Sequence, residues 1–144
     1  MQLSLSAAVS DAYASLFAGV PPARLGVALS GGGDSTALLL LTRAALPETE
    51  IFAATVDHRL REGSAAEAAE AGALCARLGV AHEILEWEGW AGQGNLQDAA
   101  RAARRALLSD WAARHGIAHV ALGHTRDDQA ETVLLRLARG SGVD

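Results

Sequence analysis

The chain has 144 residues, 50% of them hydrophobic and 20% charged, a balance that is typical of one soluble globular domain. Its formal net charge of −5 excludes a surface that attracts nucleic acid all over, so contact with RNA requires a local patch or a further domain. All 12 basic residues are arginines, which excludes a P-loop lysine and a Schiff-base lysine. The single cysteine, Cys75, excludes an intrachain disulfide and a four-cysteine zinc site. The opening residues have neither a basic segment nor a long apolar core, so we expect a cytoplasmic protein without a signal peptide or membrane span.

The predicted elements alternate as in a doubly wound α/β domain. In chain order they are a helix at 5–18, a strand at 24–30, a helix at 35–46, a strand at 50–58, a helix at 64–79, a strand at 81–87, a helix at 96–116, a strand at 117–124 and a helix at 126–140. The strands are short apolar or alternating runs, and the helices between them have the length of crossover connections. We therefore predict a Rossmann-like open parallel sheet with helices on both faces, in one domain over residues 1–144.

A glycine-rich turn joins the first predicted strand to the next helix. It reads Ser30-Gly31-Gly32-Gly33-Asp34-Ser35. Glycines let backbone amides approach an anion closely, and the helix N-terminus adds partial positive charge. A tight turn with Asp34 or Ser35 as the helix cap is the structural alternative. The position after the first strand of an α/β sheet favours ligand binding, although the turn matches neither the dinucleotide nor the Walker pattern.

The sequence SGGGDS resembles the S-G-G-x-D-S signature of the PP-loop, or N-type, ATP pyrophosphatases. This resemblance implies cleavage of ATP between its α and β phosphates, with ATP and Mg²⁺ as cofactors. Residues 30–35 would hold the departing pyrophosphate, and Asp34 would act together with Mg²⁺. A hard cation bridges carboxylate and phosphate oxygens, so a carboxylate in this turn favours the reaction.

Polar residues also follow the second predicted strand, at the same edge of the sheet. The stretch TVDHRLREGSAAEA resembles the V-D-H-x-L-R-x-x-S-x-x-E-A segment of tRNA(Ile)-lysidine synthetases, one branch of the PP-loop family. The resemblance implies that adenine and ribose bind here, with Val56 and Asp57 as candidates through backbone contacts. It also implies that Arg61 contacts phosphate or RNA. A polar loop that leads into a capped helix is the alternative.

Three arginines lie close together in the long predicted helix. Arg101, Arg104 and Arg105 are spaced to share one flank, whereas an apolar flank that includes Trp111 is expected to face the core. A solvated face with acidic neighbours is one interpretation, and a guanidinium fork for phosphate is the other. The stretch GNLQDAARAARRALL resembles the family pattern G-N-x-x-x-x-A-R-x-x-R-Y. Arg101 and Arg104 match that pattern, and Arg105 stands where the family usually has tyrosine.

The segment LGHTRDDQAET at 122–132 is the second strong motif. Thr125-x-x-Asp128 has the spacing of a helix capping box, and the predicted helix places Asp128 and Glu131 on one face near its start. Two carboxylates there require a positive group between them, either an ammonium group or Mg²⁺. The segment resembles the H-x-x-x-D-D-Q-x-E-T motif of lysidine synthetases. The resemblance implies that Asp128 and Glu131 receive the amine of substrate lysine and that His124 lies beside the reacting base.

The two motifs imply an ATP-dependent carbon–nitrogen ligase. It would adenylate C2 of the wobble cytidine in isoleucine tRNA with a CAU anticodon and join L-lysine to it, releasing AMP and pyrophosphate. The resemblance covers residues 24–142 and implies a catalytic domain without the C-terminal tRNA-binding region. The sequence leaves the oligomeric state open, with a homodimer as one option. One alternative is a PP-loop tRNA thiolase for 2-thiocytidine or 2-thiouridine, which would need cysteine pairs or an iron–sulfur cluster. The other is a non-catalytic ATP-binding module, which would leave ATP intact.

Overall fold

The computed structural model describes residues 2–29, 33–57, 63–87, 94–126 and 129–136. The elements are α1 (Gln2–Leu16), β1 (Arg24–Ala28), α2 (Gly33–Ala45), β2 (Glu50–Asp57), α3 (Ser64–Leu78), β3 (Ala81–Glu86), α4 (Leu96–Arg114), β4 (His119–Arg126) and β5 (Gln129–Arg136). The elements from α1 to β4 match the predicted ones in type and order, with boundaries that agree to within three residues. None of the described helices has the length and apolarity that a membrane span requires.

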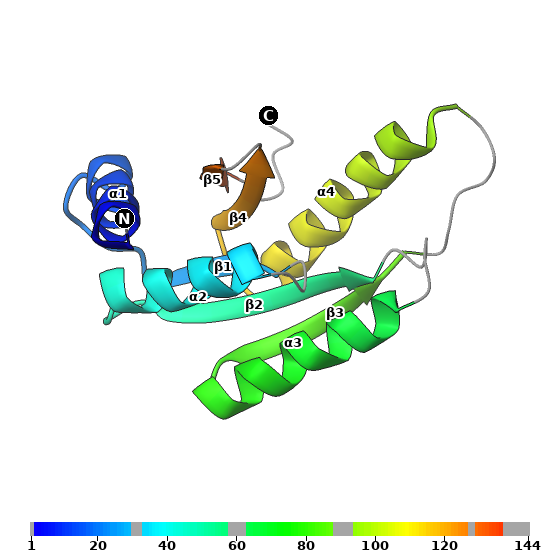
Figure 1. The fold of residues 1–144 in the computed structure, drawn as a ribbon, viewed down its shortest axis with the longest axis horizontal. Helices are drawn as coiled ribbons and strands as arrows, with labels where there is room; N and C mark the ends of the chain where they lie inside the picture. Colours follow the sequence, from blue (N-terminus) through cyan, green and yellow to red (C-terminus); the bar gives the residue numbers. More distant parts are fainter. Residues whose placement is uncertain (1, 30–32, 58–62, 88–93, 127–128, 137–144) are drawn as a thin grey trace.

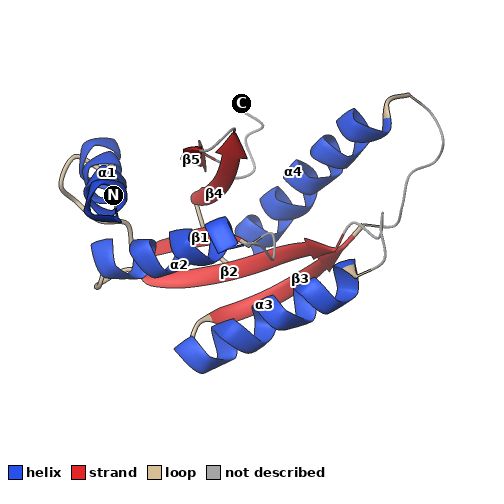
Figure 2. Ribbon diagram, in the orientation of Figure 1, coloured by secondary structure: helices blue, strands red, loops and turns tan. Residues whose placement is uncertain are grey.

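The strands form one sheet in the order β3-β2-β1-β4-β5 (Figures 1 and 2). β1 to β4 are parallel to one another, and β5 is antiparallel to β4. The chain starts in the middle of the sheet, moves outward through β2 and β3, and returns through α4 to β4 on the other side of β1. The boundary between β1 and β4 is therefore the switch point of the sheet. The predicted parallel sheet is confirmed for these four strands.

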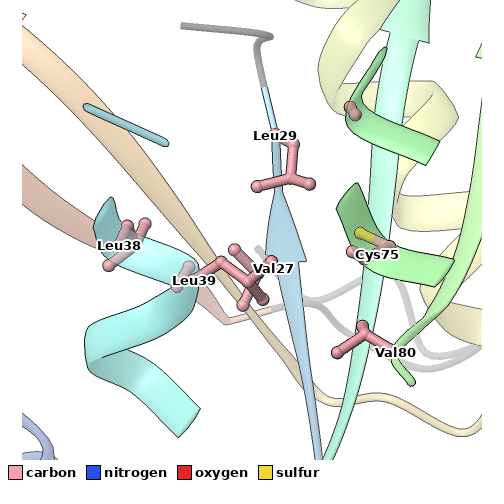
Figure 3. Close-up of a cluster of buried hydrophobic side chains, with 9 residues drawn as sticks. Val27, Leu29, Leu38, Leu39, Cys75 and Val80 are labelled. Atoms are coloured by element: carbon pink, nitrogen blue, oxygen red, sulfur yellow. The ribbon is translucent and has the colours of Figure 1, made fainter. Parts of the chain in front are cut away.

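α2 and α3 cover one face of the sheet, and α1 packs beside α2. Val27 of β1 is fully buried on this face, in a cluster that includes Leu39 of α2 and Cys75 of α3 (Figure 3). α1 is joined to α2 by a buried hydrogen bond of 2.8 Å between the hydroxyls of Tyr13 and Thr42. Leaving a buried hydroxyl without a partner costs about 1–3 kcal/mol. This bond therefore holds α1 in one position against the rest of the fold.

α4 covers the opposite face with its C-terminal half. Leu108 and Trp111 are buried there, in a cluster with residues of β1, β2 and β4. Gly26 of β1 lies directly below the indole ring, since a Cβ at this position would come within 2.9 Å of Cζ3 of Trp111. The close approach of helix and sheet therefore requires glycine at this position. The N-terminal half of α4, from Leu96 to Arg104, has no fully buried residue among those whose side chains are described.

The last element differs from its prediction. Residues 126–140 were expected to form a helix, but β4 runs to Arg126 and β5 returns antiparallel to it. The pairing covers the whole of β4, from His119 opposite Arg136 to Arg126 opposite Gln129. Without β5, one edge of β4 would present a row of unpaired backbone groups. Pairing over eight positions with the strand directly before it outweighs the local capping signal, because strand formation depends on neighbouring strands more than on intrinsic propensity.

Candidate functional site

The candidate site is the carboxyl edge of the sheet, where β1 ends before the strands on either side of it. The last β1 residue, Ala28, is in register with Ala54 of β2 and Leu122 of β4. β2 continues to Asp57 and β4 continues to Arg126. β1 therefore ends between two longer strands. This edge includes the switch point, where open α/β sheets bind their ligands.

The backbone of Val56 faces the space beyond the end of β1. The Leu29 amide donates to the Ala54 carbonyl at 2.8 Å, and no later bond joins β1 to β2 among the described residues. On the other side of β2, the Trp87 amide donates to the Asp57 carbonyl at 3.1 Å. Peptide groups of a parallel strand point alternately to its two neighbours, so the amide and carbonyl of Val56 point toward the β1 side. A hydrogen-bond donor and an acceptor therefore lie side by side at this edge. The Asp57 side chain is buried, with 6% of its surface exposed.

The start of α2 lies at the same edge. Gly33 is the first residue of α2, and Asp34 and Ser35 follow in its first turn. The first amides of a helix have no intrahelical partner and carry partial positive charge. The predicted turn therefore leads into a helix N-terminus, as an anion site of this kind requires. Ser30, Gly31 and Gly32 lie outside the described residues.

A cavity of about 450 Å³ opens between α2 and α3 beside the end of β1. Leu29 and Leu74 form apolar parts of its wall, and Thr36 and Arg77 form polar parts. The sequence analysis did not identify these residues, because apolar positions on adjacent helices carry no chemical signal of their own. The volume lies within the range of small-ligand sites, so the cavity provides room for part of a nucleotide beside the turn.

The three arginines of α4 are neighbours on the helix surface, as their spacing predicts, but they differ in exposure. Arg101 is on the outer side of the helix, where its Nη2 lies 3.4 Å from Oδ1 of Asp98 and its side chain is 73% exposed. Arg105 is also exposed. Arg104 is half-buried on the inner side, and burial lowers the pKa of its guanidinium. The described part of the chain offers Arg104 no carboxylate partner.

The inward position of Arg104 follows from its spacing to the buried residues of α4. It precedes Leu108 by four residues and Trp111 by seven, which places it on the same side of the helix. α4 runs from the carboxyl end of β3 to the amino end of β4, so its N-terminal half lies toward the carboxyl edge. Arg104 is one turn closer to that edge than Leu108.

The structure brings two residues of the last motif into register. His124 lies on β4 directly opposite Glu131 on β5. The expectation that Asp128 and Glu131 share a helix face is wrong, because Glu131 belongs to a strand. Asp128 lies outside the described residues, as does Arg61.

A parallel α/β sheet with a helix N-terminus and exposed backbone groups at its switch point defines the class of nucleotide-binding α/β domains. The chain belongs to the PP-loop family, because the family model of the PP-loop domain matches residues 5–144.

Two curated relatives illustrate the similarity. The chain is 57% identical over 129 residues to a tRNA(Ile)-lysidine synthase of Ruegeria pomeroyi, covering 88% of this chain and 31% of that protein. It is 46% identical over 140 residues to a tRNA(Ile)-lysidine synthase of Novosphingobium aromaticivorans, covering 97% of this chain and 42% of that protein. The chain spans about a third of the length of the curated relatives it matches.

Solved structures of low sequence identity share the fold. The U34-tRNA thiolase NcsA from Methanococcus maripaludis has a TM-score of 0.73 at 17% identity, covering 88% of this chain and 46% of that chain. The NH3-dependent NAD synthetase from Campylobacter jejuni has a TM-score of 0.56 at 21% identity, covering 83% of this chain and 54% of that chain. Both confirm the α/β architecture.

Proposed function

We propose that this chain is the ATP-binding catalytic domain of a tRNA(Ile)-lysidine synthase. The C2 oxygen of the wobble cytidine attacks the α-phosphorus of ATP, and pyrophosphate leaves. An amine of lysine then attacks C2 and loses a proton, and AMP leaves with the oxygen. The names of relatives that are 44–57% identical support this reaction, as does the PP-loop domain.

The carboxyl edge suits the parts of ATP. Adenine presents a donor and an acceptor on one edge, and the amide and carbonyl of Val56 are complementary to such a pair, with Asp57 beside them. The phosphates would lie against residues 30–35, where the amides at the start of α2 favour anions. This arrangement assigns adenine to β2 and pyrophosphate to the turn after β1.

Asp34 is the proposed ligand of Mg²⁺. Mg²⁺ is usually held by one or two carboxylates together with phosphate oxygens and water. Bound Mg²⁺ would neutralise charge on the departing pyrophosphate.

The half-buried Arg104 is the observation that carries the proposal. A guanidinium on the inner side of α4, near the carboxyl edge and without a described carboxylate partner, suits a ligand anion. The α-phosphate, which becomes part of AMP, is the anion we assign to it. Arg61 and Arg101 would contact phosphates of the tRNA.

Lysine is assigned to the β4–β5 side of the edge. Asp128 and Glu131 would hold its ammonium groups, and His124 would lie beside the cytidine. The register of Glu131 opposite His124 supports a lysine site adjacent to the base site. Holding the amine next to the activated carbon supplies the proximity that such a displacement requires.

Sulfur transfer is the less favoured function. Cys75 is the single cysteine, and it is fully buried in the core between α3 and the sheet. Burial raises the pKa of its thiol, which disfavours the reactive thiolate. This chain therefore offers no reactive thiol of its own to a thiolase reaction.

The test is transfer of labelled lysine to isoleucine tRNA with a CAU anticodon, in the presence of ATP and Mg²⁺. The Ruegeria pomeroyi relative serves as the positive control, and Asp128→Asn tests the lysine site. We expect labelled tRNA together with AMP and pyrophosphate, and a loss of label in the variant. Intact ATP after incubation with tRNA and lysine would instead indicate a non-catalytic ATP-binding module.

A further inference from the structure

The outer side of α4 carries a small basic surface on an acidic protein. We call it the outer flank and define it by four exposed residues, Arg101, Ala102, Arg105 and Ala106. The molecule as a whole has a net charge of −5, so a positive flank is a local exception. Three of the 12 arginines lie within five consecutive residues of this helix.

The two outer arginines are available to a partner. Arg101 contacts only Asp98 among the described residues, at 3.4 Å and with both side chains more than 70% exposed. A pair this exposed contributes about 0–1 kcal/mol, so a phosphate can displace it. Arg105 has no carboxylate partner in the described part of the chain. By contrast, Arg114 near the end of α4 forms ion pairs with Glu83 at 3.1 Å and with Asp110 at 3.4 Å.

The geometry of the flank suits a phosphate chain. Arg101 and Arg105 are four residues apart, which is about 6 Å along the helix axis. Ala102 and Ala106 lie between and beside them and leave room for a backbone to approach. The flank belongs to the half of α4 that lies toward the carboxyl edge, so a chain bound there passes next to the proposed site.

We propose that the outer flank of α4 binds the sugar–phosphate backbone of the tRNA through Arg101 and Arg105, while Arg104 on the inner side serves the reacting phosphate. This inference rests on the proposed function, because it names the surface on which that RNA substrate lies. Neighbouring arginines of α4 then serve two anions, with Arg104 directed to ATP and Arg101 and Arg105 directed to RNA.

The test measures binding of the anticodon stem-loop of isoleucine tRNA with a CAU anticodon over a range of salt concentrations. The double variant R101A/R105A is expected to bind roughly tenfold more weakly, about threefold for each arginine, because each phosphate contact contributes counterion release. For this variant, the slope of log Kd against the logarithm of the salt concentration is expected to decrease by about 1 for each arginine removed. Both side chains are exposed, so the thermal midpoint should not change.

Two further variants sharpen the test. Arg43→Ala is the matched control, since Arg43 is an exposed arginine on α2 without a described carboxylate partner, and it should leave RNA binding unchanged. Asp98→Asn removes the competing carboxylate and keeps the backbone amide that Asn95 caps at 3.2 Å, so it should bind RNA more tightly. An unchanged salt dependence in R101A/R105A, or an equal loss in Arg43→Ala, overturns the proposal. A parallel loss of ATP affinity in R101A/R105A also overturns it, because the flank would then serve the nucleotide.

The reaction assay separates this inference from the proposed function. If lysine transfer occurs but RNA affinity does not depend on Arg101 and Arg105, the proposed role of the outer flank is wrong and the proposed function stands. If RNA binding depends on them but ATP stays intact with tRNA and lysine, the flank is supported and the function fails.

Discussion

Arg104 occupies a position that a helix packed on a sheet ordinarily gives to an apolar side chain. Its neighbours on the inner side of α4, Leu108 and Trp111, are buried in the core. Placing a charged group there costs free energy unless an opposite charge compensates it, and burial lowers the pKa of this guanidinium accordingly. A ligand anion beside Arg104 would offset this cost.

Replacing Arg104 with methionine should separate stability from binding. Met keeps an unbranched aliphatic chain and removes the charge, so we expect a thermal midpoint at least as high as that of the unsubstituted chain. Affinity for ATP should fall about ten- to a hundredfold, because a hydrogen bond to a charged group contributes about 1.5–3 kcal/mol. Thermal unfolding without ligand and calorimetric titration with ATP measure the two effects.

Arg105→Met is the matched control for that variant, because Arg105 is exposed on the outer side of the same helix. It should leave ATP affinity unchanged. If Arg104→Met bound ATP as tightly as the unsubstituted chain, the assignment of Arg104 to a phosphate would be wrong.

At the level of elements, the parallel strands were predictable and β5 was not. β1 to β4 are apolar or alternating runs followed by turn residues, and these are local properties of the chain. The segment 126–140 has local features of a helix, including the capping spacing of Thr125 and Asp128. Its observed strand depends on pairing with the free edge of β4, the strand directly before it, and the capping spacing does not report that pairing.

Cysteine pairs can distinguish the hairpin from a helix in solution. In a Cys75→Ala background, Thr125→Cys with Ala130→Cys should form a disulfide, because these positions face each other in the β4–β5 register. Residues opposite each other in antiparallel strands have Cα atoms about 4.5–5.5 Å apart, within disulfide range. Mass spectrometry under mild oxidation measures the crosslink.

The control pair for this experiment is Thr125→Cys with Gln129→Cys. These positions are four apart, so a helix would place them on one face. In the hairpin, Gln129 is adjacent to the residue opposite Thr125, so the register assigns the two positions to different faces of the sheet. Efficient crosslinking of the control pair alone would show that this segment is helical.

The candidate site shows the same limit of sequence reasoning. The start of α2 at Gly33 and the end of β2 lie at one edge as expected, because parallel strands bring their carboxyl ends together. The inward position of Trp111 was predicted correctly, but Arg104 was grouped with Arg101 and Arg105 because the three arginines are neighbours on the helix surface. The packing of Trp111 over Gly26 brings the side of α4 that carries Arg104 toward the sheet.

For the whole molecule, we expect stability to fall as the solution becomes acidic. Burial lowers the pKa of His82 from its ordinary value of 6.5, despite the opposing charge of Glu83. The unfolded chain then binds a proton that the folded chain does not, so the free energy of unfolding decreases as pH falls below about 6.5. Urea unfolding at pH 7 and pH 5 measures this change.

His82→Gln tests the origin of that change. The hydroxyl oxygen of Thr55 lies 2.9 Å from Nε2 of His82. A glutamine at position 82 can still form a hydrogen bond with the Thr55 hydroxyl, but it does not take up a proton. The variant should lose less stability between pH 7 and pH 5 than the unsubstituted chain. Equal losses in both would assign the acid sensitivity to other groups.

Glu83 adds a second contribution at lower pH. Burial alone would raise its pKa, but hydrogen bonds from Arg114 and His115 outweigh burial and lower it. A carboxylate with a lowered pKa stabilises the fold above its ordinary pKa and loses that effect as pH falls further. The acid transition of the wild-type chain should therefore have two parts.

The early end of β1 has a consequence for the sheet as a mechanical unit. Beyond Ala28, β2 and β4 have no strand between them, so nothing in the described backbone links their last residues laterally. A planar ring that pairs with the Val56 amide and carbonyl would occupy the space beyond the end of β1 and link the last residues of β2 to those of β4. Proton exchange at the Val56 amide with solvent water should then slow when nucleotide is present, making one peptide group a direct reporter of occupancy.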